Sequence, residues 1–228
     1  MPSSAAARAQ MVKRQIARRG VGDRLVLQAM REVPREAFVD TGMKEFAFDD
    51  SPLPIGEGQT ISQPYIVAFM AEAAELSRED RVLEVGTGSG YAAAVFGRIA
   101  RAVFTVERYA SLAEQARQRL AEVGIGNVFV RVGDGTLGCS DAAPFDAIIV
   151  AAGAPEAPAA LKQQLAIGGR LIIPLGEGDV QSLTRIRRKS EALYETEELA
   201  SVRFVPLVGA QGWTEDGHRA TAGRPDVS

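Results

Sequence analysis

The stretch Glu84-Val85-Gly86-Thr87-Gly88-Ser89-Gly90 decides the fold, because it stands where an apolar strand over 82–85 must turn into a helix. Glycine takes backbone conformations that are closed to other residues and lets the chain approach a ligand closely. Open parallel sheets bind their ligands in the crevice beyond the carboxyl ends of the strands. A dinucleotide fingerprint that began at Gly86 would need glycine at position 91, where this chain has Tyr91. The stretch therefore predicts a ligand-binding loop that departs from the dinucleotide pattern.

Apolar, β-rich runs alternate with helical patterns after this loop begins. Strands are predicted over 82–85, 102–106, 128–132, 145–150 and 170–174, an alternation typical of a parallel sheet with helices on both faces. Ser111 and Glu114 have the spacing of a capping box at the start of one intervening helix. After Pro174, runs over 182–188 and 201–208 predict an antiparallel hairpin at the sheet edge. The predicted fold is α/β: a doubly wound, mostly parallel, Rossmann-like sheet with an antiparallel edge hairpin and N-terminal helices.

Three segments are expected within one structural domain. Residues 1–78 are predicted to form a helical segment that covers the substrate site, 79–213 the ligand-binding core and 214–228 a mobile tail. Near the N-terminus, 5–19 favours an exposed basic helix, and Asp23 is placed to cap a second helix. Residues 38–59, rich in Gly and Pro, predict a long ordered loop and are the candidate for closing over the site.

Composition excludes several classes of protein. With 228 residues, 46% of them hydrophobic and 24% charged, the chain matches an average globular protein. A net charge of −3 gives no global attraction to nucleic acid or to an anionic membrane. With one cysteine and one histidine, the chain can form neither an internal disulfide nor a Cys/His zinc cluster. There is neither an apolar secretion signal nor a run of about 18 apolar residues. We expect a cytoplasmic monomer without a metal and without nucleic-acid or membrane partners.

Acidic residues follow two further strands. Glu107 ends the second predicted strand, where a carboxylate can accept hydrogen bonds from both hydroxyls of a ribose. Asp134, within Gly133-Asp134-Gly135, follows the third strand and is placed to face an adenine amino group. Either pattern alone is common, and NAD enzymes also place an acid at the first of these positions. Their succession at neighbouring strand ends predicts a nucleoside-containing cofactor.

The pattern ExGxGxG over 84–90 resembles the first motif of the class I S-adenosylmethionine-dependent methyltransferases. The segment PLPIGEGQTISQP over 52–64 resembles the signature of the protein-L-isoaspartate O-methyltransferases. Further matching segments are VLEVGTGSGY (82–91), FDAIIVAAGAP (145–155), GGRLIIP (168–174) and VRFVPLVG (202–209). The resemblance extends from about Met11 to Trp213. Many members of this family have histidine where this chain has Glu57, and some have it in place of Tyr65.

The resemblance implies methyl transfer from S-adenosylmethionine, which leaves S-adenosylhomocysteine, to the α-carboxylate of L-isoaspartyl residues in damaged proteins and peptides. D-Aspartyl residues are a further candidate acceptor. Such a carboxylate is already ionised at neutral pH, so the reaction needs no general base. Opposite charges neutralise each other in the transition state, so excluding water and aligning the reactants should provide most of the acceleration.

Site residues are carried over from the same resemblance. Ser62 is implied as the catalytic residue that holds the substrate carboxylate; the alternative is that Ser62 caps a helix starting at Pro64. The cofactor-binding residues are expected to be Thr60, Ile61, Glu84, Gly86, Thr87, Gly88, Ser89, Glu107, Asp134 and Gly135. The substrate-binding residues are expected to be Ser62, Val202, Arg203 and Phe204. A last strand over 202–208 could pair with an extended peptide or be an internal strand without a ligand.

Two other functions remain open on this fold. One is a methyltransferase acting on nucleic acid or on a small molecule. Base amino-group methylation typically uses an Asp/Asn-Pro-Pro-aromatic motif after the fourth strand, and this chain has Ala151-Ala152-Gly153-Ala154-Pro155 there. The other is a non-catalytic protein that senses the cofactor. Tyr91, at the third-glycine position, argues against an NAD-dependent dehydrogenase.

Overall fold

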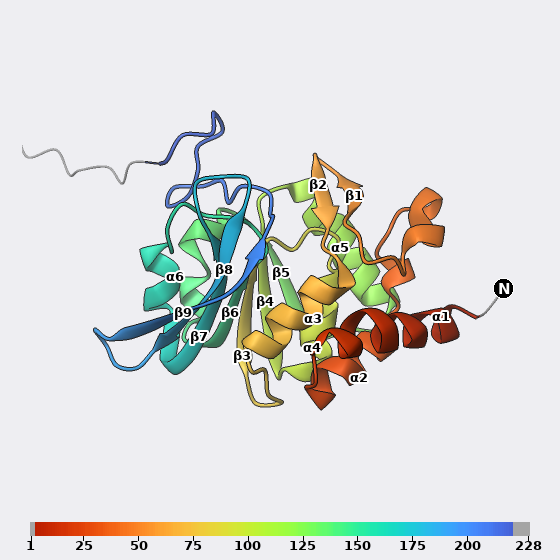
Figure 1. The fold of residues 1–228 in the computed structure, drawn as a ribbon. Coiled ribbons are helices and arrows are strands. Elements are labelled where there is room, and N and C mark those ends of the chain that lie inside the picture. Colours follow the sequence, from red (N-terminus) through yellow and green to blue (C-terminus); the bar gives the residue numbers. More distant parts are fainter. Residues whose placement is uncertain (1–2, 221–228) are drawn as a thin grey trace, which may run out of the picture.

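A computed structural model describes residues 3–220 of the chain. Its centre is a seven-stranded sheet in the order β5-β4-β3-β6-β7-β8-β9 (Figure 1). The strands are β3 (Arg81–Val85), β4 (Ala102–Glu107), β5 (Val128–Val132), β6 (Phe145–Val150), β7 (Leu165–Leu175), β8 (Gln181–Arg188) and β9 (Tyr194–Val202). Strands β3 to β7 run parallel, whereas β8 and β9 pair antiparallel at one edge. The predicted fold class is confirmed.

Helices cover both faces of the sheet (Figure 1). The α-helices are α1 (Ser4–Met11), α2 (Arg24–Glu32), α3 (Pro64–Ala73), α4 (Tyr91–Ile99), α5 (Ala110–Glu122) and α6 (Ala159–Gln163). A π-helical turn spans Val12–Ile16, and 3₁₀ turns span Ala17–Arg19, Arg35–Ala37, Thr41–Phe46, Gly135–Leu137 and Ser140–Ala142. A separate two-stranded hairpin, β1 (Leu53–Gly56) and β2 (Gln59–Ile61), precedes α3.

Two hydrophobic cores lie on opposite faces of the sheet. Successive strand residues point to opposite faces, and Val82 accordingly belongs to one core and Leu83 to the other. The first core gathers buried residues of α1 to α5 and of the β1–β2 hairpin, and the second gathers those around α6. The N-terminal elements therefore pack directly on the sheet that carries the glycine loop. The division of the chain into three segments stays a prediction.

The N-terminal helices partly follow the sequence. Asp23 caps α2, because its carboxylate accepts a hydrogen bond from Val26 N at 2.9 Å. The segment over 5–19 is helical but changes from α to π to 3₁₀ geometry. Met11 and Ile16 are buried in it, so the prediction of an exposed helix holds only for its outer side. The loop over 38–59 contains the Thr41–Phe46 turn and β1.

Two local predictions are wrong. Tyr109 is the N-cap of α5 and no side chain caps that helix, because the Ser111 hydroxyl donates instead to Glu57 at 2.6 Å. The last strand runs over Tyr194–Val202 rather than over 201–208. The alternation of apolar and polar residues is weak in β9 because this edge strand is largely exposed to water. The segment that follows contains Pro206, which has no N–H to donate to a sheet. That segment pairs with the loop after β6, where Gly153 N donates to the Val205 carbonyl at 2.7 Å.

The described part of the predicted tail makes defined contacts. Thr214 N donates to the His218 carbonyl at 2.7 Å, and Arg219 pairs with Glu156. Arg108 pairs with Glu215. Residues 221–228, the rest of the predicted mobile tail, lie outside the described residues. Over residues 3–220, no helix combines the length and the apolar character needed to cross a membrane.

Candidate active site

The glycine loop leaves the end of β3 in a conformation that requires glycine. Gly86, Gly88 and Gly90 have φ angles of 93°, 51° and 88°, in the left-handed region that other residues avoid. Space is also short: a Cβ at Gly90 would lie 3.2 Å from the Cβ of Ala116, and one at Gly88 3.1 Å from Cδ1 of Ile55. The loop is therefore held between α5 and the β1–β2 hairpin, and its backbone faces the crevice beyond the strands.

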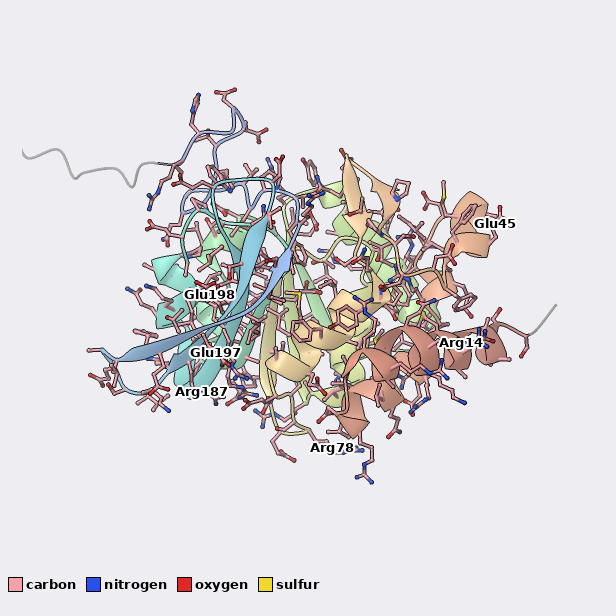
Figure 2. The ribbon with its side chains drawn as sticks, viewed as in Figure 1. Arg14, Glu45, Arg78, Arg187, Glu197 and Glu198 are labelled. Carbon is pink, nitrogen blue, oxygen red and sulfur yellow. The ribbon has the colours of Figure 1, made fainter. Side chains whose placement is uncertain are left out.

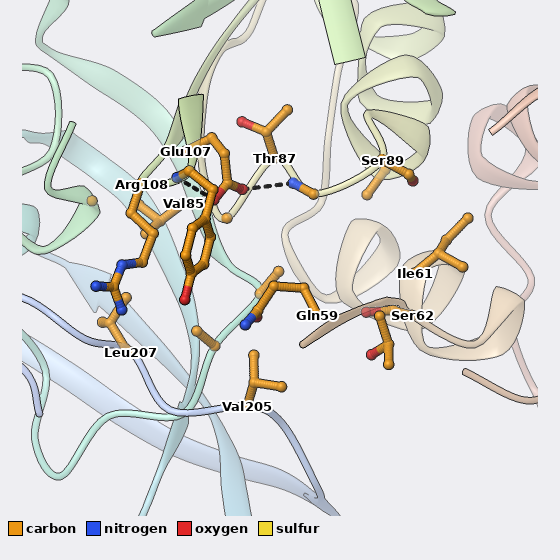
Figure 3. A pocket seen from close by; sticks show the side chains of 18 of the residues that line it. Gln59, Ile61, Ser62, Val85, Thr87, Ser89, Glu107, Arg108, Val205 and Leu207 are labelled. Atoms are coloured by element: carbon orange, nitrogen blue, oxygen red, sulfur yellow. Dashed lines mark hydrogen bonds between the residues drawn. The ribbon is translucent and has the colours of Figure 1, made fainter. Parts of the chain in front are cut away.

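A cavity opens above this loop, at the carboxyl ends of β3, β4 and β6 (Figure 3). In the sheet order, β4 lies on one side of β3 and β6 on the other, so the cavity sits at the switch point where open sheets bind ligands. Its walls come from the glycine loop, from β2 and Ser62, from 107–109, from Gly135 and 151–152, and from 205–208. The expected residues Thr60, Ile61, Gly86, Thr87, Gly88 and Ser89 all line it.

Glu107 joins this wall to the loop. Its Oε2 accepts from Gly88 N at 2.8 Å and its Oε1 from Tyr109 N at 3.0 Å, two of the contacts drawn in Figure 3. The side chain is buried but lines the cavity. A carboxylate has about four acceptor positions, so acceptor capacity is left for the hydroxyls of a ribose.

Glu84 lies behind the loop and does not line the cavity. Its Oε2 accepts from the Thr105 hydroxyl at 2.6 Å, and that hydroxyl is also 2.6 Å from the hydroxyl of Thr87. Burial raises the pKa of Glu84 to about 8, despite the hydrogen bond from Thr105. At neutral pH the side chain is therefore mostly the uncharged acid. It supports the loop through Thr105 and Thr87 rather than by touching a ligand.

Asp134 and Gly135, although adjacent in the sequence, line two different hollows. Gly135 lines the cavity, where a Cβ would collide with Val85. The Asp134 carboxylate accepts from Thr136 N at 2.8 Å and from Ala210 N at 2.7 Å, and it lines a neighbouring hollow with Trp213. Asp134 thus fixes the segment after the sheet beside the cavity. Its predicted contact with adenine stays a prediction.

Ser62 lies where the cavity meets a second groove. The groove is lined by the residues Arg19, Pro52, Thr60, Ser62, Gln63, Tyr65, Ile66, Phe69, Ala151, Val180, Ala200, Ser201, Val202, Arg203, Phe204 and Val205. It includes all four expected substrate residues, and it shares Thr60, Ser62, Ala151 and Val205 with the cavity. Gln63 is the N-cap of α3 and no side chain caps that helix, so the alternative role for Ser62 is wrong. Within residues 3–220 the Ser62 hydroxyl has no hydrogen-bond partner, which leaves it available to a ligand.

Sequence reasoning missed several lining residues. Gln59, Arg108 and Tyr109 adjoin expected positions, so the neighbours of Thr60 and Glu107 were the available signal. The segment 205–208 gave none, because it was expected in the sheet. Trp213 stabilises this segment, since its Nε1 donates to the Gly153 carbonyl at 3.0 Å and its backbone N donates to the Leu207 carbonyl at 2.8 Å.

A Rossmann-like sheet with an antiparallel edge, a three-glycine loop and an acid bonded to that loop together define the class: this is a methyltransferase fold with a nucleoside-cofactor site. The family model described as protein-L-isoaspartate(D-aspartate) O-methyltransferase matches residues 6–212. The chain belongs to this family.

Relatives and solved structures support the same family assignment. The chain is 61% identical to protein-L-isoaspartate O-methyltransferase 2 of Pelobacter propionicus over 89% of this chain and 91% of that one. It is 57% identical to protein-L-isoaspartate O-methyltransferase 1 of Rhodopseudomonas palustris, over 98% and 91%. A solved protein-L-isoaspartate O-methyltransferase superposes with a TM-score of 0.82 at 30% identity, covering 90% of this chain and 67% of the other. A putative Plasmodium falciparum enzyme in complex with S-adenosyl-L-homocysteine has a TM-score of 0.77 at 27% identity, over 88% and 98%.

Proposed function

We propose that this chain transfers a methyl group from S-adenosylmethionine to the free α-carboxylate of L-isoaspartyl residues in damaged proteins and peptides, with D-aspartyl residues as a second acceptor. This is the first step of protein repair. The observation that carries the proposal is the position of Ser62, which lines both the cavity and the groove. One ligand in each would meet there.

The residues of the cavity fit the cofactor. The glycine loop brings backbone close to a ligand, Glu107 presents a buried carboxylate to ribose hydroxyls, and Thr60 and Ile61 close the wall nearest Ser62. When bound, S-adenosylmethionine supplies a methyl group on a positively charged sulfur. Its departure needs no acid or base from the chain, because the acceptor carboxylate is already ionised.

Ser62 positions the acceptor. Its hydroxyl can donate to one carboxylate oxygen of the substrate and leave the other oxygen free to attack the methyl carbon. The apolar side chains Val67, Val205 and Leu207 line the same cavity and would limit the access of water to the reacting groups. Water would stabilise the separated charges of the carboxylate and the sulfonium more than the partly neutralised transition state, so its exclusion lowers the barrier. Alignment removes the entropy cost of bringing the reactants together.

The groove suits an extended peptide. It runs between α3 and the end of β9, the last strand of the sheet, whose outer edge carries unpaired backbone groups. Pairing with this edge would read the backbone of the substrate, as β-augmentation does, rather than one side-chain sequence. Val202, Arg203 and Phe204 would then contact the residues around the damaged position. An enzyme that accepts damage in many proteins needs such recognition.

The test is methyl transfer from labelled S-adenosylmethionine to two peptides that differ only in isoaspartate or aspartate at one position. A base-labile label on the isoaspartyl peptide alone is expected. Ser62→Ala should lower kcat about tenfold to a hundredfold and leave cofactor binding unchanged, whereas Ser77→Ala, remote from both hollows, should retain activity. Cofactor binding without label on either peptide would reject the proposal and favour a nucleic-acid or small-molecule acceptor.

A monomeric state, a cytoplasmic location and the lack of nucleic-acid partners stay predictions.

A further inference from the structure

The groove beside Ser62 has an uneven charge. Two arginines, Arg19 and Arg203, line it, and its other lining residues carry no charge. Arg19 comes from the N-terminal helical segment and Arg203 from the chain just after β9, so they reach the groove from different parts of the fold. Whatever occupies the groove between them meets positive charge without a facing carboxylate.

The Arg19 guanidinium already has partners within the protein. Its guanidinium lies 3.5 Å from the centre of the Tyr65 ring and pairs with Asp50. Asp50 in turn accepts a hydrogen bond from Tyr65 N at 3.0 Å, which ties the pair to the first turn of α3. Arg19 therefore forms a fixed wall of the groove, and Asp50 neutralises most of its charge.

Arg203 is different. It is exposed, and it forms no ion pair within residues 3–220. Two cations of the nearby hairpin are paired: Arg185 with Glu197 at 2.5 Å and Lys189 with Glu195 at 3.0 Å. Glu198 of β9 instead accepts a hydrogen bond from the Ser182 hydroxyl at 3.1 Å. Figure 2 shows Glu197 and Arg187 on this hairpin. Arg203 thus presents an unmatched cation to the groove, two residues from Ser201 and next to the last residue of β9.

We infer that Arg203 determines specificity by favouring isoaspartyl peptides with an aspartate or glutamate side chain within two residues of the damaged position. The inference rests on the proposed function and narrows its substrate class. The damaged carboxylate is held at Ser62, and a second carboxylate on the same peptide lies along the groove against Arg203. Both charges are partly hydrated there, so the preference is moderate and weakens with salt.

The experiment uses peptides with isoaspartate among alanines and a single glutamate or lysine at each of the two positions on either side. The full chain, Arg203→Ala, Arg203→Glu and the control Arg78→Glu are compared by kcat and KM for each peptide. Arg78 lies in the turn between α3 and β3, at the end of the strands opposite the groove (Figure 2). Arg78→Glu therefore makes the same change in net charge as Arg203→Glu without altering the groove.

For at least one position, we expect the full chain to have a KM about threefold to fivefold lower with glutamate than with lysine. Arg203→Ala should abolish the difference and Arg203→Glu should reverse it. Arg78→Glu should retain the difference and keep the kcat of the full chain on the uncharged peptide. Raising the ionic strength from about 0.05 M to about 0.5 M should reduce the KM difference between the glutamate and lysine peptides in the full chain. Equal KM ratios in the full chain and in Arg203→Glu would overturn the inference. If the uncharged isoaspartyl peptide is methylated, the proposed function stands even then; if it is not, both fall.

Discussion

Glu107 and Gly88 are joined directly: the carboxylate at the end of β4 accepts a hydrogen bond from the backbone of the loop after β3 at 2.8 Å. The acid that would bind the ribose therefore also fixes the loop that would hold the rest of the cofactor. Loop geometry and ribose binding depend on the same side chain.

Glu107→Ala should weaken binding of S-adenosylhomocysteine about a hundredfold, because both the ribose acceptor and the support of the loop are lost. Glu107→Gln keeps one acceptor oxygen and should lose about tenfold. Titration calorimetry measures both, with Glu114→Gln on the exposed side of α5 as a control. Unchanged affinity in Glu107→Ala would show that the carboxylate does not contact the cofactor.

Gly90 is expected to tolerate no side chain. Gly90→Ala combines a φ of 88° with a Cβ 3.2 Å from that of Ala116. Gly124→Ala is the matched control, since Gly124 has a φ of 69° and nothing within 4 Å of a new Cβ. Both variants incur the left-handed strain, which costs about 1–2 kcal/mol. Gly90→Ala should lower the free energy of unfolding by about 1 kcal/mol more than Gly124→Ala, because only its new Cβ is crowded against Ala116. Urea unfolding compares them, and equal losses would mean that α5 moves away without cost.

The sequence predicted the sheet core well because physical signals there are local. Buried parallel strands such as β6 read as continuous apolar runs, and the glycine loop needs residues that few other structures require. Glu107 was predicted to lie at the site because it ends a recognisable strand, whereas Ser62 was carried over from the resemblance of the segment over 52–64 to the family's signature.

Features set by tertiary contacts were not predictable in this way. β9 is an edge strand whose outward residues are mostly polar, so its pattern was missed and the neighbouring 201–208 was chosen instead. Ser111 has the sequence of a capping residue but bonds to Glu57, 54 residues earlier in the chain. The same contact explains how this chain uses glutamate at Glu57: the carboxylate holds the β1–β2 hairpin against α5.

Glu84 should make stability depend on pH. Burial raises its pKa from 4.5 to about 8, so the folded state keeps a proton that the unfolded state loses. The contribution of Glu84 to stability is therefore fully present below the unfolded pKa and is lost as the pH rises to the folded pKa near 8. Glu84→Gln has the shape of the neutral acid and no proton to lose. Urea unfolding at pH 5 and pH 8 should show a larger loss for the full chain than for Glu84→Gln; equal losses would contradict the raised pKa.

Trp213 should report cofactor binding directly. It is the single tryptophan of the chain. It lines the hollow beside the cavity together with Arg108, which lines both. A bound cofactor that contacts Arg108 changes the charge and the water around the indole, so its fluorescence emission should shift in position or intensity as S-adenosylhomocysteine is added. Trp213→Phe retains an aromatic ring but loses the hydrogen bond to Gly153, and it should abolish the signal while binding persists with a few-fold weaker affinity by calorimetry. If calorimetry shows binding to the full chain while tryptophan emission stays constant, the cofactor does not reach the side of the cavity that Arg108 and the segment after β9 enclose.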